Sequence, residues 1–313
     1  MNLYQFFCLK RNAHKLFFPI LIVTFGLLTI IGCGGDGHTT DKQGNNMIDS
    51  GSWYETGFTP WPHDGNPLEG ENFIIYSDAA SLEARQYLLQ ICEEEFTIIK
   101  EKLGITDVSI FNFPAGRNNK IHIYAYKNYA PSDWGGQAYY GGYLIYSSDN
   151  PARTNLGHTV PDLYEPTIRH ELVHVVQTLI VGDNEERVHS WFAEGIAIDL
   201  SDDNFYTKIT TQEEFDSLID TYGMRNPISI EHSWNMPDDI EHIDTLYYYP
   251  MFWLSVSYLV DPDGYGGSFY DVRDIFIDVG NGTDFKTSFE TIFGISFTEY
   301  ENQFFDLMND YLE

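Results

Sequence analysis

Two short segments, HELVH at residues 170–174 and WFAEGIA at residues 191–197, carry most of the structural information in this chain of 313 residues. Each segment lies in an apolar pattern with the period of an α-helix. The sequence therefore predicts one helix over residues 165–180, opened by Glu165-Pro166, and a second helix over residues 190–200.

The first of these helices predicts a metal site. His170 and His174 are four residues apart, so they lie on one face of the helix, one turn apart, and both imidazoles can reach one ion. Glu171 projects about 100° round the helix from His170, beside the ion, which is the place for a general base. Apolar residues project from the opposite side and are expected to pack into the core: Ile168, Leu172, Val175 and Leu179.

The second segment predicts the third metal ligand, Glu194, which follows His174 by 20 positions. WFAEGIA resembles the WxxEGxA segment of gluzincin zinc peptidases, in which a glutamate of a second helix completes the zinc site. Thermolysin-like and M1-like enzymes share this long separation, and the tryptophan with the Gly-x-Ala points to the M1-like, peptidase MA branch. Gly195 and Ala197 are small, which predicts that the second helix packs closely against the first.

The resemblance implies a zinc peptidase. In such an enzyme His170, His174 and Glu194 bind Zn²⁺, and Glu171 activates the water that attacks a peptide bond. A His-His-Glu set leaves one coordination position open, as in catalytic zinc sites, whereas structural sites are closed by four protein ligands.

The resemblance covers about residues 70–313 and implies an α+β fold, a thermolysin-like two-lobed metallopeptidase domain. A mixed β-sheet and the zinc helices are expected over residues 71–200, and a helical lobe over residues 201–313. Strands are predicted at residues 71–77, 120–126 and 139–147. Helices are predicted at residues 81–103, 211–222, 247–260, 270–279, 284–293 and 297–312. A strand within residues 137–147 is implied to align the substrate backbone.

A further catalytic residue is implied at Tyr249, nine positions before Tyr258-Leu259, where M1-like enzymes place a tyrosine that hydrogen-bonds the oxyanion. Three tyrosines run together at residues 247–249, and packing explains any of them equally well. Thermolysin-like enzymes carry an aspartate one turn beyond the third ligand to orient a zinc histidine; Ile198 stands there, and Asp199 is one residue late.

Two other features of the sequence bear on the site. The chain has no GxMEN-like segment, the motif with which M1 aminopeptidases hold a substrate amine, so aminopeptidase specificity is not implied. His189 lies just before the second helix, and a surface or core role is expected for it.

Residues 1–32 have the pattern of an export signal. A basic start precedes an apolar run over residues 16–31, which is short for a membrane span. The run ends in Ile30-Ile31-Gly32-Cys33, which resembles the lipobox of bacterial lipoproteins. The resemblance implies that a lipid on Cys33 anchors the mature chain to the membrane outside the cytoplasm, and Gly34 favours the outer membrane. An ordinary transmembrane anchor is the alternative.

Residues 33–70 are rich in Gly, Asp, Asn, Thr and Pro and predict a flexible tether. The net charge of −30 argues against a nucleic-acid partner, since phosphate contacts need clustered Lys and Arg. Cys92 is expected to be a small buried apolar residue.

The expected partner is a peptide or protein substrate. The alternative is a surface lipoprotein binding module or adhesin that keeps the peptidase scaffold without catalysis. The base Glu171 argues against that alternative, because a scaffold does not require it.

Overall fold

The structure is a computed structural model, and it describes residues 67–77, 82–114, 118–126, 136–139, 143–147, 160–201, 208–209, 211–230, 247–262 and 264–310. The expected signal segment, Cys33 and the tether up to residue 66 lie outside these ranges. The last residues of the expected tether form a strand, β1 (Leu68–Glu69), because they pair with the strand that follows.

A five-stranded mixed sheet forms the N-terminal part of the fold. The strands are β1, β2 (Phe73–Ser77), β3 (Ile121–Tyr126), β4 (Gly136–Tyr139) and β5 (Tyr143–Ser147), in the order β1-β2-β3-β5-β4. The central pairs β2–β3 and β3–β5 are parallel, and the outer pairs are antiparallel. The single strand predicted over residues 139–147 is wrong: β4 and β5 are two strands that pair with each other.

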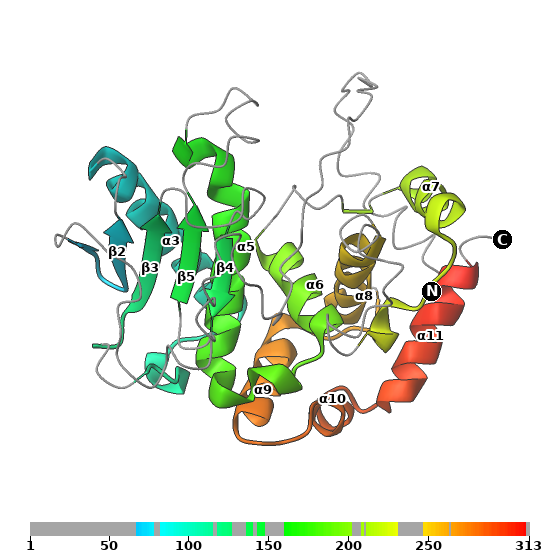
Figure 1. Cartoon of the computed structure of the whole chain (residues 1–313). Coiled ribbons are helices and arrows are strands. Elements are labelled where there is room, and N and C mark those ends of the chain that lie inside the picture. Colours follow the sequence, from blue (N-terminus) through cyan, green and yellow to red (C-terminus); the bar gives the residue numbers. More distant parts are fainter. Residues whose placement is uncertain are drawn as a thin grey trace, which may run out of the picture.

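Two long helices, α3 (Leu82–Lys102) and α5 (Val160–Val181), pack side by side against this sheet (Figure 1). Phe73 of β2 meets Phe96 of α3 edge-to-face, with ring centroids 5.6 Å apart. Cys92 of α3 is fully buried, as expected. Helix α5 begins five residues before the predicted Glu165, because Pro161 already provides a proline suited to a first turn.

The rest of the described chain is helical. It comprises α6 (Ser190–Leu200), α7 (Gln212–Tyr222), α8 (Tyr249–Val260), α9 (Phe269–Gly280), α10 (Phe285–Phe293) and α11 (Phe297–Asp310), with short 3-10 turns at Val108–Ile110, Gly182–Arg187 and Pro227–Ser229. These helices confirm the predicted ones to within a few residues at each end. In Figure 1 they lie on the far side of α5 from most of the sheet.

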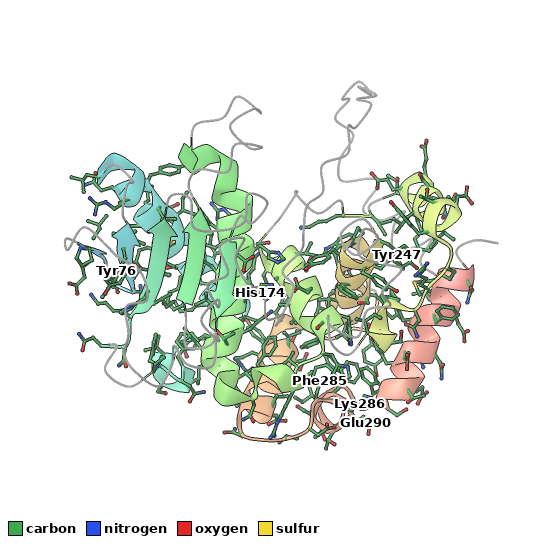
Figure 2. The ribbon with its side chains drawn as sticks, in the orientation of Figure 1. Tyr76, His174, Tyr247, Phe285, Lys286 and Glu290 are labelled. Atoms are coloured by element: carbon green, nitrogen blue, oxygen red, sulfur yellow. The ribbon has the colours of Figure 1, made fainter. Side chains whose placement is uncertain are left out.

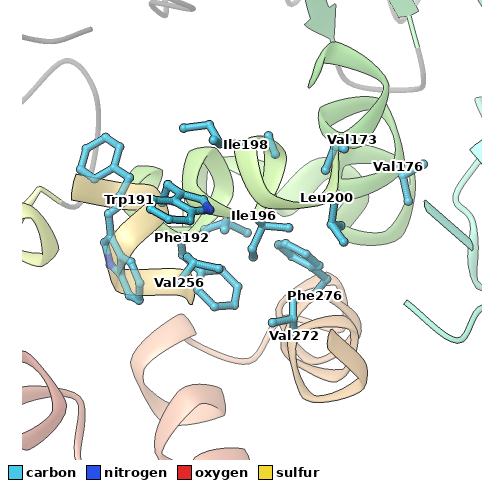
Figure 3. Packing of buried hydrophobic residues seen from close by; sticks show 14 of the residues in the cluster. Val173, Val176, Trp191, Phe192, Ile196, Ile198, Leu200, Val256, Val272 and Phe276 are labelled. Atoms are coloured by element: carbon cyan, nitrogen blue, oxygen red, sulfur yellow. The ribbon is translucent and has the colours of Figure 1, made fainter. Parts of the chain in front are cut away.

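One hydrophobic core joins the sheet to the C-terminal helices. Helix α6 lies within it, and Figure 3 shows Phe192 and Ile196 of α6 beside Val256 of α8 and Phe276 of α9. Phe192 of α6 meets Phe276 of α9 with ring centroids 5.6 Å apart. Trp191 is fully buried and stacks on Tyr300 of α11 at 6.1 Å.

Helix α6 contacts α5, as predicted, but at Gly195 its close approach is to α8. A Cβ atom on Gly195 would lie 2.4 Å from the backbone oxygen of Phe252 and 2.6 Å from Cγ2 of Val256. The prediction that α6 needs a small residue at Gly195 is confirmed, but the neighbouring helix at that position is α8 and not α5. The size of a residue alone does not show which neighbouring helix requires it.

The architecture is α+β, mostly helical with one small sheet. Among the described helices, none combines the length and apolar character that a membrane span requires.

Candidate metal centre

Three side chains from two helices converge on one point. His170 and His174 come from α5, and Glu194 comes from α6. The two Nε2 atoms are 3.1 Å apart, and Oε2 of Glu194 lies 3.3 Å from Nε2 of His170 and 3.2 Å from Nε2 of His174. Figure 2 shows His174 at the junction of α5 with α6. The structure therefore brings together the three residues that the sequence predicted as ligands.

The donor set fits a metal ion. Donors bound tetrahedrally to zinc at about 2.0–2.2 Å are separated from one another by about 3.3–3.6 Å. The observed edges of 3.1 to 3.3 Å lie at the lower end of that range or just below it. Two imidazole nitrogens and a carboxylate oxygen are also donors that zinc prefers. The group could thus hold one metal ion, although these distances do not by themselves select zinc.

Burial strengthens the electrostatic interactions among the three side chains. The side chain of His170 is 1% exposed, and those of His174 and Glu194 are each 13% exposed. Burial lowers the pKa of His174, but the carboxylates of Glu194 and Glu171 and the hydrogen bonds to Glu194 and Gln177 outweigh it and raise this pKa to about 9. Burial raises the pKa of Glu194, but the two histidines outweigh it and lower this pKa to about 2. In the metal-free cluster the charged forms of His174 and Glu194 therefore stabilise each other.

The local sequence explains why the histidines meet α6. The predicted apolar side of α5 is buried, with Leu172, Val175 and Leu179 fully enclosed and Ile168 nearly so. Val173 and Val176 are also fully buried, so α5 is enclosed on more sides than an amphipathic helix of the surface. The polar cluster occupies the strip of α5 that faces α6.

Glu171 is buried beside the cluster, as predicted. Its Oε2 accepts a hydrogen bond from the backbone N–H of Ala138, at 2.9 Å. Ala138 belongs to β4, the strand at one edge of the sheet, and is in register with Leu144 of β5. The base expected at the metal is thus held next to an edge strand.

Gln177 was not predicted. Its Oε1 lies 2.9 Å from Nδ1 of His174, and its Nε2 donates to the carbonyl oxygen of Ala193 at 3.0 Å. It stands three residues after His174, on the same face of α5, and this i, i+3 spacing was the signal that could have found it.

The other expected residues have different places. Tyr249 opens α8, is buried, and lies with its ring 6.0 Å from that of Phe252. Its role as a hydrogen-bond donor to the oxyanion stays a prediction. Asp199 accepts a hydrogen bond from Nε1 of Trp253 at 2.8 Å, so it braces α6 against α8. His189 is buried and stacks on Phe285 with centroids 4.3 Å apart, which confirms its core role.

Tyr247, the first of the three tyrosines, is a structural residue. Its hydroxyl accepts from the N–H of Arg225 at 2.7 Å and donates to the carbonyl oxygen of Arg225 at 2.8 Å. Burial raises the pKa of Tyr247 to about 12. It is labelled in Figure 2, well apart from His174.

Comparisons with known proteins give little guidance. No protein-family model and no curated protein matches the chain. Among solved structures, it is similar to a crystal structure of a functionally unknown conserved protein mutant from Bacillus anthracis str. Ames, with 13% identity and a TM-score of 0.33. The match covers 78% of this chain and 51% of that chain, so this chain spans about half the length of that protein. At this TM-score the similarity indicates neither a shared fold nor a shared function.

Proposed function

We propose that the protein is a zinc-dependent peptidase, with His170, His174 and Glu194 as the metal ligands and Glu171 as the general base. The single observation that carries the proposal is the triangle of ligand atoms with edges of 3.1 to 3.3 Å, with the carboxylate of Glu171 on the adjacent residue of the same helix. Three protein ligands leave a coordination position open, which suits catalysis.

Zinc, when bound, would supply Lewis-acid chemistry, polarising a substrate carbonyl and lowering the pKa of a water molecule. The chain would supply the proton transfers. The carboxylate of Glu171 takes the proton of the attacking water and delivers it to the leaving amine. The hydrogen bond from Ala138 to Oε2 holds this carboxylate on the side of the edge strand while it does so.

The edge strand β4 supports a peptide as the substrate. The N–H of Ala138 points to Glu171, so residue 138 turns its backbone groups away from β5. An extended peptide can add to such an edge through main-chain hydrogen bonds, which would present its carbonyl groups beside Glu171. This interpretation also supports the finer fold proposal, a thermolysin-like domain with the site between a sheet lobe and a helical lobe.

The test is the substitution Glu171→Gln in the whole chain. Hydrolysis of a mixture of peptides should fall by about 10²- to 10⁴-fold, the usual contribution of a general base, while bound zinc stays near one ion per chain. Glu93→Gln is the matched control, because Glu93 is a part-buried carboxylate on α3 that binds Asn72. Unchanged activity of Glu171→Gln would reject the mechanism, and a wild-type protein that binds zinc without cleaving any peptide would favour a binding module.

We also propose that the chain is exported and carries a lipid on Cys33, which would anchor it to the membrane outside the cytoplasm. The lipobox-like Ile30-Ile31-Gly32-Cys33 supports this. Radiolabelled palmitate should enter the wild-type chain in bacteria and should not enter Cys33→Ser; equal labelling would contradict the proposal.

A further inference from the structure

Gln177 connects the two helices that supply the metal ligands. Its side chain is on α5, one turn beyond His174, and it reaches the carbonyl oxygen of Ala193 on α6, the residue directly before Glu194. The same amide contacts Nδ1 of His174. One buried side chain therefore contacts one ligand directly and the backbone beside another.

The two contacts fix which way the amide points. The carbonyl oxygen of Ala193 can only accept a hydrogen bond, so the NH₂ group of Gln177 must face it. The amide oxygen then faces His174, and because this oxygen can only accept, Nδ1 of His174 must carry a hydrogen. The reversed amide would set two acceptors 3.0 Å apart at Ala193, in a place where Gln177 is only 6% exposed and water cannot compensate.

The orientation has a direct consequence for the cluster. When Nδ1 of a neutral imidazole carries the hydrogen, Nε2 carries the lone pair. Nε2 is the atom of His174 that lies 3.1 Å from His170 and 3.2 Å from Glu194. The amide thus selects the tautomer in which the lone pair of His174 faces the other two ligands.

We propose that Gln177 is a positioning residue for this metal centre, which sets the tautomer and ring orientation of His174 and ties them to the helix position of Glu194. The proposal deepens the proposed function, because it rests on metal binding by the same three residues. It takes the role that sequence comparison with thermolysin-like enzymes left open at Ile198 and Asp199. Asp199 is engaged with Trp253 of α8 instead.

Two substitutions separate positioning from simple packing. Gln177→Met keeps the length of the side chain but removes both hydrogen bonds, and zinc affinity should fall by about 10- to 100-fold, as for other groups that orient a ligand. Gln177→Glu keeps an acceptor for Nδ1 of His174 but sets a carboxylate oxygen against the carbonyl oxygen of Ala193, so it should recover part of the lost affinity. Affinities are measured by competition with a chromogenic chelator.

The matched control is Thr178→Val on the same helix. Thr178 is a buried polar residue whose hydroxyl donates to the carbonyl oxygen of Val175. Its substitution should lower the melting temperature and leave zinc affinity unchanged. If Gln177→Met binds zinc as tightly as the wild type, or if Gln177→Glu loses as much affinity as Gln177→Met, Gln177 is not a positioning residue.

A spectroscopic measurement on the wild-type chain covers the case in which Gln177→Met does not fold. In ¹⁵N-histidine-labelled, zinc-loaded protein, long-range ¹H–¹⁵N spectra should show His174 with its proton on Nδ1 and the metal on Nε2. Metal on Nδ1 would overturn the proposal. These results are separate from a failure of the proposed function, which would appear as unchanged peptide cleavage by Glu171→Gln whatever the state of His174.

Discussion

Helix α6 has one polar and one apolar face, and the adjacent residues Glu194 and Gly195 lie on different ones. Glu194 points to α5 and joins a buried polar cluster with two histidines. Gly195 points to α8, where its backbone lies so close to Phe252 that a methyl group does not fit. One face is polar and set by hydrogen-bond geometry; the other is apolar and set by contact distance. Adjacent positions of one helix can thus carry the chemistry and the packing separately.

The contrast has a physical basis. The apolar face gains its free energy from burial and close contact, which does not depend on any ion. The polar face gathers a carboxylate and two imidazoles, and their mutual interactions change when a cation is present. Substitutions on the two faces should therefore differ in whether their effect depends on metal.

The largest effect is expected from Glu194→Gln. An amide oxygen is a poorer zinc ligand than a carboxylate, and one ligand's share of the roughly 10–16 kcal/mol of a structural zinc site is about 3–4 kcal/mol, which corresponds to a loss of about 100- to 1,000-fold in affinity. Titration calorimetry with zinc measures this loss. An affinity within threefold of the wild type would contradict the assignment of Glu194 as a zinc ligand.

Gly195→Ala should act on stability alone. The added Cβ would lie 2.4 Å from a backbone atom, which cannot move aside cheaply. Overpacking of this kind costs about 1–3 kcal/mol, more than the gain of about 1 kcal/mol from helix propensity at most such sites. Urea unfolding with chelator present should show a net loss of up to about 2 kcal/mol, from these same terms. A zinc affinity that fell with it would show that the two faces are not separate.

Ala138→Pro tests the hydrogen bond that holds the base. Proline lacks the N–H that donates to Glu171, and its ring would take the place of that N–H and push the carboxylate away, whereas no hydrogen bond to β5 is lost because this N–H points away from β5. Peptide cleavage should fall by about 10- to 150-fold, the equivalent of the roughly 1.5–3 kcal/mol of one hydrogen bond to a charged group, with zinc retained. Ala138→Ser keeps the N–H and serves as the control; equal activity in the two variants would contradict the positioning of Glu171 by β4.

The smallest effect is a shift in the pH dependence of stability. In the metal-free protein the pKa of His174 is raised to about 9, so its contribution is complete below pH 6.5 and is lost as the pH rises towards 9. The pKa of Glu194 is lowered to about 2, so its contribution is complete above pH 4.5 and is lost as the pH falls towards 2.

With chelator present, the pair of His174 and Glu194 should therefore raise the melting temperature most between pH 4.5 and 6.5. Zinc must displace the proton of His174, so zinc-loaded protein should gain stability relative to metal-free protein as the pH rises towards 9. A gain from zinc that shrinks over that range would contradict the direction of the His174 shift.

The sequence predicted those parts that depend on local spacing. The separation of His170 from His174 is a property of one helix, and the apolar periods located nearly every helix. The glycine pair within YYGGYLIYS was interpreted as part of one strand, although glycines are equally compatible with a tight turn between two strands.

Of the features that depend on which elements meet, the family resemblance predicted the approach of Glu194 to the two histidines, but two others were not predicted. Gly195 was assigned to the wrong neighbour, and the role of Gln177 requires the carbonyl group of Ala193, which only the packing of α5 on α6 brings near. The role of Tyr249 at the metal stays a prediction, because the contact of its ring with Phe252 does not test it.

The account depends on one zinc ion bound by two imidazoles and one carboxylate. X-ray absorption at the zinc edge of the whole chain tests this most directly. We predict four nitrogen or oxygen neighbours at about 2.0–2.2 Å, two of them with the outer-shell signal of imidazole, in a spectrum that changes in Glu194→Gln. Sulfur neighbours, six oxygen neighbours without imidazole, or a spectrum that is the same in Glu194→Gln would contradict it.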